Sequence, residues 1–234
     1  MGDSVAASRA SVEDILRQFG HLPGNLPNQV FGADLIRVSN QIRGIYRYSD
    51  YDHRPELPPP DKSVDYLQTE EFRIGYACFK HCVAKVIEPR TICEIGIGGG
   101  MGARAFLAAS PSAHYLGIDD GSKQRDDHWP FIDYVRQSLQ FHKYSFEFQI
   151  IDSTNLAELP HADLFHVDGA HDFNHAFNDV KLAVQSDSEW ILVDDARDAV
   201  VMAAAFCVLQ ITNRAYEWAY FDDTWTGNLL IRRR

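Results

Sequence analysis

The stretch from Thr91 to Ala103, TICEIGIGGGMGA, decides the fold of this chain. It begins with an apolar run between Ile92 and Ile95, which is typical of a buried strand. Five glycines follow between positions 96 and 102, and an apolar helical pattern that includes Phe106 comes after them. Glycines let a backbone approach a ligand closely, and a helix N-terminus offers free N–H groups. A strand, a glycine turn and a helix in this order predict a cradle for a nucleotide-like ligand.

Glu94 stands two residues before the first glycine and indicates which kind of ligand this cradle would bind. A carboxylate at this place repels a pyrophosphate, but it suits the ribose or the ammonium group of a cationic cofactor. We therefore expect Glu94 to surround the centre of such a cofactor together with Gly96, Gly98 and Gly100.

The composition narrows the class of protein. The chain has 234 residues, of which 45% are hydrophobic, enough for one sizeable α/β domain and a small extension. Its 22 basic and 33 acidic residues leave a net charge of -11, which disfavours nucleic acid and anionic membranes as partners. The four cysteines form no CxxC pair, and no signal peptide or membrane span is expected. These features predict a soluble, cytoplasmic protein with reduced cysteines.

Hydrophobic periodicity predicts alternating strands and helices after the glycine turn. Strands are expected at 114–120, 144–152, 162–169 and 189–195, with helices that start near Phe131, Phe173 and Val201 between or after them. Strands separated by helices form a parallel, doubly wound α/β sheet. The last two strands, around 216–221 and 226–231, are separated by a short turn only, so they should form an antiparallel hairpin.

Residues 1–68 are expected to form an N-terminal extension, and residues 69–234 the ligand-binding domain. Helical spacing predicts helices at 12–19, 31–46 and 69–86. A segment rich in tyrosine and proline, 46–60, ends in three consecutive prolines that exclude a regular helix. It is either a surface connection with packed tyrosines or a lid over a substrate, to which Trp129 and Trp225 would contribute.

Acidic side chains occur at the carboxyl ends of four successive strands: Asp119 and Asp120, Asp152, Asp168, and Asp194 and Asp195. Ligands bind outside these ends in an open parallel sheet, and helix capping alone does not explain acids on four strands. Asp119 is placed to accept both hydroxyls of a ribose, with Asp120 as the nearby alternative. Asp152 and Ser153, one strand further out, would meet an adenine edge.

Asp168, Asp194 and Asp195 are expected on adjacent strands on the other side of the switch point. Three converging carboxylates repel one another unless a cation joins them, and all-oxygen ligation favours Mg²⁺, Ca²⁺ or Mn²⁺ over zinc. The structural alternative is that Asp168 orders the cofactor loop while Asp194 and Asp195 cap a helix.

His171 follows Asp168 by three residues, at the start of a helix over the expected cleft. With a pKa near ~6.5, a histidine can take a proton from a substrate hydroxyl. Capping the helix and binding a metal are the competing roles. His175 lies one turn further on, but no Glu follows His171 as HExxH requires, which disfavours a zinc pair.

These residues resemble the class I S-adenosylmethionine-dependent methyltransferases. The run Glu94-x-Gly96-x-Gly98-x-Gly100 matches the cofactor motif of that superfamily, and the resemblance extends over roughly residues 70 to 234. It implies a Rossmann-like sheet of seven strands that ends in the antiparallel hairpin. It also implies that S-adenosylmethionine is bound by the residues already singled out, namely Glu94, Gly96, Gly98, Gly100, Asp119, Asp120, Asp152, Ser153 and Asp168.

Within the superfamily, LFHVDGAH and WILVDD are similar to segments of metal-dependent small-molecule O-methyltransferases. These include the catechol and caffeoyl-coenzyme A type and the sugar O-methyltransferases of natural-product pathways. In the catechol type, an Asp ends the fourth strand and an Asp-Asn pair ends the fifth, which correspond to Asp168, Asp194 and Asp195. The resemblance implies a divalent ion there, with Mg²⁺ expected. That family has a catalytic lysine where this chain has His171.

We therefore expect methyl transfer from S-adenosylmethionine to a hydroxyl of a small molecule, with metal assistance and with His171 as the base. Two alternatives remain: metal-free O- or N-methyl transfer with His171 as the base, and a non-catalytic domain that binds the cofactor. A nicotinamide oxidoreductase is disfavoured, because it needs G-x-G-x-x-G and Met101 occupies the last position. The sequence leaves open whether the protein forms a homo-oligomer.

Overall fold

The computed structural model describes residues 32–49, 51, 76–123, 130–212, 214–222, 224 and 226–234. The predicted helix at 12–19, most of the segment 46–60, the first turns of the predicted helix at 69–86, and both Trp129 and Trp225 lie outside these residues.

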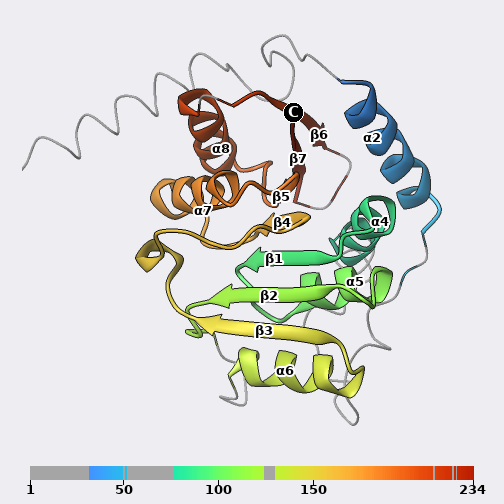
Figure 1. The fold of residues 1–234 in the computed structure, drawn as a ribbon, viewed down its shortest axis with the longest axis vertical. Coiled ribbons are helices and arrows are strands. Elements are labelled where there is room, and N and C mark those ends of the chain that lie inside the picture. The colour runs from blue at the N-terminus through green and yellow to red at the C-terminus, as the bar shows by residue number, and fades with distance from the viewer. Residues whose placement is uncertain are drawn as a thin grey trace, which may run out of the picture.

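Seven strands form one sheet in the order β3-β2-β1-β4-β5-β7-β6 (Figure 1). They are β1 (Thr91–Ile95), β2 (His114–Asp119), β3 (Ser145–Ile150), β4 (Leu164–Val167), β5 (Trp190–Val193), β6 (Tyr216–Phe221) and β7 (Asn228–Arg233). The first five strands are parallel, whereas β7 runs antiparallel to both β5 and β6. The predicted seven-stranded sheet and its C-terminal hairpin are thus confirmed. The strand order reverses between β1 and β4, which is the switch point where a crevice opens.

Helices cover both faces of the sheet (Figure 1). One face carries α2 (Ala33–Tyr46), α4 (Cys78–Ile87), α5 (Met101–Ala109) and α6 (Phe131–Phe141), and the other carries α7 (Phe173–Gln185) and α8 (Ala199–Ile211). Side chains alternate along β1, so that Ile92 packs beneath the first group of helices and Cys93 beneath the second. A short 3-10 turn, η4 (Ser153–Asn155), follows β3.

The strands are shorter than predicted, and this places the acids at the rim of the sheet. Asp119 is the last residue of β2, Asp168 follows β4 directly and Asp194 follows β5 directly, while Asp152 comes two residues after β3. These four acids therefore lie at or just beyond the last hydrogen-bonded pairs of the sheet, where the chain turns away from it.

Helix α2 belongs to the core of the sheet domain. Its residues Leu35, Val38 and Ile42 are buried in the same cluster as Phe79 of α4 and Phe221 of β6. Although the expected division at residue 68 assigns α2 to an extension, its apolar stripe covers the sheet near the C-terminal hairpin. The division itself stays a prediction.

None of the helices among the described residues has the length and apolar character that a membrane crossing requires.

Candidate functional site

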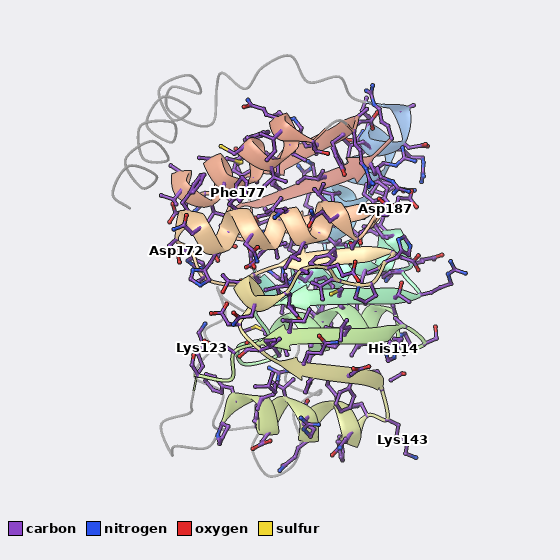
Figure 2. All side chains as sticks on the ribbon, turned by 60° about the vertical axis from the view of Figure 1, so that its left-hand side comes forward. His114, Lys123, Lys143, Asp172, Phe177 and Asp187 are labelled. Carbon is purple, nitrogen blue, oxygen red and sulfur yellow. The ribbon has the colours of Figure 1, made fainter. Side chains whose placement is uncertain are left out.

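A cavity of about 240 Å³ opens at the carboxyl ends of β1 to β4. In Figure 2, the labelled residues Lys123 and Asp172 lie at this end of the strands, and His114 lies at the opposite end. The cavity brings together six of the expected cofactor residues, which are Gly96, Asp119, Asp120, Asp152, Ser153 and Asp168. Of the described residues, the other three expected contacts, Glu94, Gly98 and Gly100, do not line it.

Asp119 holds the glycine loop in place. Its Oδ2 accepts hydrogen bonds from the backbone N–H groups of Ile97 and Gly98, at 2.9 and 3.1 Å, and its Oδ1 accepts from Gly121 N–H at 2.8 Å. The carboxylate is half-buried at the cavity wall, and of its four lone pairs one, on Oδ1, is left by these three hydrogen bonds. Asp119 therefore orders the loop as well as facing the cavity, and its expected contact with a ribose stays a prediction.

Gly96 is the position where the loop needs glycine. Its φ is +89°, and a Cβ atom here would lie 1.9 Å from the backbone oxygen of Asp168. Gly96 N–H donates to Ile118 O at 2.8 Å, and Asp168 N–H donates to Ile95 O at 2.8 Å. The turn after β1 and the turn after β4 thus meet backbone to backbone at the switch point.

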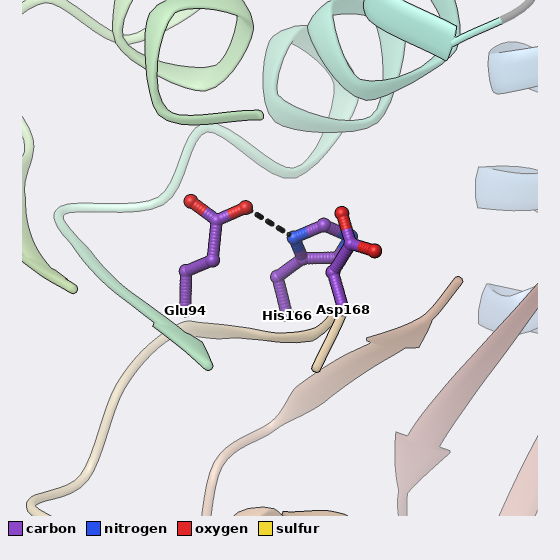
Figure 3. A group of neighbouring side chains, drawn as sticks. All are labelled: Glu94, His166 and Asp168. Atoms are coloured by element: carbon purple, nitrogen blue, oxygen red, sulfur yellow. Dashed lines mark hydrogen bonds and ion pairs between the residues drawn. The ribbon is translucent and has the colours of Figure 1, made fainter. Parts of the chain in front are cut away.

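Glu94 lies beneath the loop, under the first turn of α5, and is fully buried. Its Oε1 is 2.8 Å from Nδ1 of His166, and its other oxygen accepts a hydrogen bond from the hydroxyl of Tyr115. Figure 3 shows the bond to His166, with Asp168 beside the imidazole. Glu94 is therefore bonded by its own strand neighbours below the loop, and a direct contact with the cofactor stays a prediction.

Sequence reasoning assigned no role to His166, although a signal was available. His166 pairs with Glu94 in the β1–β4 register and stands two residues before Asp168, so both side chains leave β4 on the same side. A polar residue at that position in an otherwise apolar strand indicates a partner on the neighbouring strand.

Asp168 accepts a hydrogen bond from the hydroxyl of Tyr76, which stands just before α4. Burial, followed by the neighbouring charge of Asp194, raises the pKa of Asp168 well above its usual range. An acid in this position is stabilised by a proton or by a nearby cation.

Asp194 is bonded at both oxygens. Lys80 of α4 lies 2.7 Å from Oδ2, the side chains of both residues are fully buried, and the hydroxyl of Thr226 donates to Oδ1. Burial opposes the ionisation of Asp194, but the Lys80 charge and further contacts hold its pKa below the usual value. Sequence reasoning missed Lys80, whose position inside the buried face of α4 was the available signal.

Asp195 pairs with His171. His171 Nε2 lies 2.9 Å from Asp195 Oδ2, and the two side chains are 53% and 23% exposed. Burial, and then the charge of Asp194, raises the pKa of Asp195. His175, by contrast, is bonded to Asp172, the residue that caps α7.

Three of the described side chains could hold a divalent ion, and they differ from the three that were predicted. Asp168, His171 and Asp195 each offer a ligand atom, and these atoms lie within 4.8 Å of one another. Asp194 does not join them, because its oxygens face Lys80 and Thr226. The structure thus brings together two of the three predicted metal carboxylates and adds the predicted base.

The outer wall of the cavity is built from the turn after β3. Asp152 accepts a hydrogen bond from Thr154 N–H at 2.9 Å, and the hydrogen bonds from Thr154 lower its pKa. Ser153 donates to Oδ1 of Asp179 at 2.5 Å, which ties this turn to α7. Asp179 was not predicted; it lies on the cavity wall, and burial raises its pKa to about 6.

Comparison with known proteins shows similarity in fold but not in sequence. No family model matches the chain, and no curated protein matches it. A candidate O-methyltransferase from Nostoc punctiforme is similar with a TM-score of 0.53 and 11% identity, over 86% of this chain and 70% of that one. The O-methyltransferase TomG from Streptomyces achromogenes, involved in tomaymycin synthesis and solved with S-adenosylmethionine, gives 0.50 and 14%, over 83% and 96%.

A methyltransferase from Geobacter sulfurreducens also gives a TM-score of 0.50, at 15% identity over 96% of each chain. The chain therefore has the fold of the S-adenosylmethionine-dependent methyltransferases, as its glycine motif predicted. At these identities the likeness extends to the fold alone, so the chemistry must be argued from the residues of the site.

Proposed function

We propose that this protein transfers a methyl group from S-adenosylmethionine to a hydroxyl of a small molecule, with a divalent ion bound beside the acceptor. The observation that carries the proposal is the charge of the cavity. Among the described residues, five aspartates line it, at positions 119, 120, 152, 168 and 179, against one lysine, Lys123. Such a wall repels the pyrophosphate of a dinucleotide and attracts the sulfonium and ammonium groups of S-adenosylmethionine.

In this reaction the protein has to position the cofactor and the acceptor and to polarise the acceptor hydroxyl, because the sulfonium already activates the methyl group. Asp119 orders the glycine loop over one half of the cavity, and Ser153 with Asp179 supports the outer wall. Beside the cavity, Asp168 of its wall together with His171 and Asp195 would hold a divalent ion. When bound, the ion would lower the pKa of an acceptor hydroxyl.

A second candidate is metal-free methyl transfer, and the contact between His171 and Asp195 favours it. A carboxylate 2.9 Å from Nε2 can accept the N–H of this nitrogen and orient the imidazole, so that the other ring nitrogen can take the proton of an acceptor hydroxyl. In this reading Asp195 serves the histidine, and no ion is needed.

Calorimetry with S-adenosylmethionine and with NADH tests the cofactor. We expect S-adenosylmethionine to bind and NADH not to bind; binding of NADH alone would contradict the proposal. Replacing the carboxylate of Asp119 by an amide, in Asp119→Asn, should weaken S-adenosylmethionine binding at least tenfold, since Asp119 holds the loop and faces the cavity.

Production of S-adenosylhomocysteine tests the reaction, with catechol and hydroxylated sugars as acceptors. We expect turnover to collapse in EDTA and to return with Mg²⁺ or Mn²⁺. Full turnover in EDTA, lost in His171→Gln, would establish the metal-free alternative. Tight cofactor binding without turnover of any acceptor would favour a non-catalytic domain.

A further inference from the structure

Lys80 is an unusual residue in this molecule, a lysine with no exposed surface whose charge faces the rim of the sheet. Its Nζ lies 2.7 Å from Asp194 Oδ2 and 3.2 Å from the ring centroid of Tyr76. A buried ammonium is tolerated only where fixed negative groups surround it, and here a carboxylate and an aromatic face do so.

Lys80 and Tyr76 stand one helical turn apart, and together they reach two strand tips. Lys80 binds Asp194 after β5, while the Tyr76 hydroxyl donates to Asp168 after β4. The start of α4 thus brings one cation and one hydrogen-bond donor to two of the three carboxylates that were expected to bind a metal.

The three carboxylates consequently differ in what they can still bind. Both oxygens of Asp194 are occupied, one by Lys80 and one by Thr226. Asp168 has one oxygen bonded to Tyr76, and Asp195 is the most exposed of the three, beside His171. An ion on Asp194 would either stand as a second cation beside the buried Lys80 ammonium, or displace it and leave the ammonium without its carboxylate, and both are strongly unfavourable.

We infer that Lys80 is a positioning residue, because its ammonium is the permanent counter-cation of Asp194. It excludes Asp194 from metal coordination. The ligands that remain are Asp168, His171 and Asp195. The assignment of ligands rests on the metal-assisted form of the proposed function. The pairing of Lys80 with Asp194 does not depend on that function. Because two of these three ligands are carboxylates, which suit Mn²⁺, this ion can serve as the probe of the site.

Binding of Mn²⁺, measured from the electron paramagnetic resonance signal of the free ion, tests the ligand set. Asp194→Asn and Asp195→Asn are matched, because each removes one negative charge from neighbouring positions. We expect Asp195→Asn to weaken Mn²⁺ binding at least tenfold and Asp194→Asn to weaken it no more than threefold. An equal loss in both variants, or a larger loss in Asp194→Asn, would overturn the inference.

Thermal unfolding without metal tests the counter-cation role separately. Lys80→Met should lower the melting temperature, and Lys80→Met with Asp194→Asn should recover at least half of that loss, because the second change removes the carboxylate left unpaired. Lys80→Arg should keep the wild-type response to Mn²⁺ if it folds. A double variant no more stable than Lys80→Met would show that Lys80 does not serve Asp194.

The outcomes separate this inference from the proposed function. A wild type that binds S-adenosylmethionine but not Mn²⁺ overturns the ligand set and the metal-assisted mechanism, while the rescue by the double variant still decides the role of Lys80. If Mn²⁺ binds and the two Asn variants differ as expected, but S-adenosylmethionine does not bind, the methyltransferase proposal is wrong and the inference about Lys80 stands.

Discussion

Asp179 shows how one buried acid can make the stability of the whole chain depend on pH. It lies on the cavity wall with Ser153 bonded to one oxygen, and the neighbouring titratable groups are His175 and Asp152. Burial raises its pKa from 3.8 to about 6. Between these values the folded protein keeps a proton that the unfolded chain has released, so the contribution of Asp179 to stability falls as pH rises from about 4 to 6.

We predict that Asp179→Asn gains stability relative to the wild type as pH rises, by up to about 3 kcal/mol between pH 4 and pH 7.5, because the amide carries no charge to bury. Urea unfolding at the two pH values measures this. Asp172→Asn is the control, because hydrogen bonds to His175 outweigh burial and lower the pKa of Asp172, which gives a trend of opposite sign. A difference that does not change with pH would contradict the assignment.

At the scale of elements, the junction between the β1 turn and the β4 turn is the tightest part of the site. Gly96 and Gly98 both have positive φ, but only Gly96 meets a neighbour, the backbone oxygen of Asp168. Backbone atoms cannot move aside as a side chain can, so the loop after β1 and the carboxylates after β4 must shift together. The loop after β1 and the turn after β4, which both line the cavity, are therefore in direct contact at this residue.

Two alanine substitutions in the same loop distinguish the cost of an unfavourable φ from the cost of a steric clash of the added Cβ atom. Gly96→Ala should cost about 3 kcal/mol or more and abolish S-adenosylmethionine binding, because it adds a clash to an unfavourable φ. Gly98→Ala, with nothing within 4 Å of the added Cβ, should cost only about 1 to 2 kcal/mol. Urea unfolding and calorimetry measure both quantities. Equal effects would show that close approach at Gly96 is not what the loop requires.

For the whole molecule, the packing of α2 indicates that this helix and the sheet unfold together. Besides its buried apolar stripe, α2 carries Arg43, which donates to Tyr220 O at 2.7 Å and lies 4.5 Å from the centroid of the Phe221 ring. These contacts join the helix to the C-terminal hairpin, 177 residues away in the chain. A helix attached in this way is part of the cooperative unit.

We predict that Ile42→Ala destabilises the protein by about 2 to 5 kcal/mol, because Ile42 is fully buried against the sheet. Ile36→Ala on the same helix should change stability by less than about 1 kcal/mol, since Ile36 is 44% exposed. Urea unfolding followed by circular dichroism and by tryptophan fluorescence should give one coincident transition in each variant. Separate transitions would mean that α2 is an independent extension.

Much of the fold could be predicted from the sequence, because the signals that determine it are local. Periodicity places strands and helices, the glycines after Ile95 specify the turn, and the short connection after Phe221 rules out a crossover. The same local signals place acids at four strand ends and predict that they share one edge of the sheet. The sequence therefore sufficed to predict which carboxylates lie around the cavity, namely Asp119, Asp152 and Asp168.

The sequence by itself determined which residues reach the site, and the tertiary structure decided what each one is free to bind. Asp194 and Asp195 are adjacent in the chain, yet one is bonded to a lysine 114 residues away and the other faces His171. Glu94, predicted to touch the cofactor, is enclosed by His166 and Tyr115 of the neighbouring strands. Hydrogen-bond partners and burial depend on contacts between distant segments, and no local pattern in a single sequence encodes them.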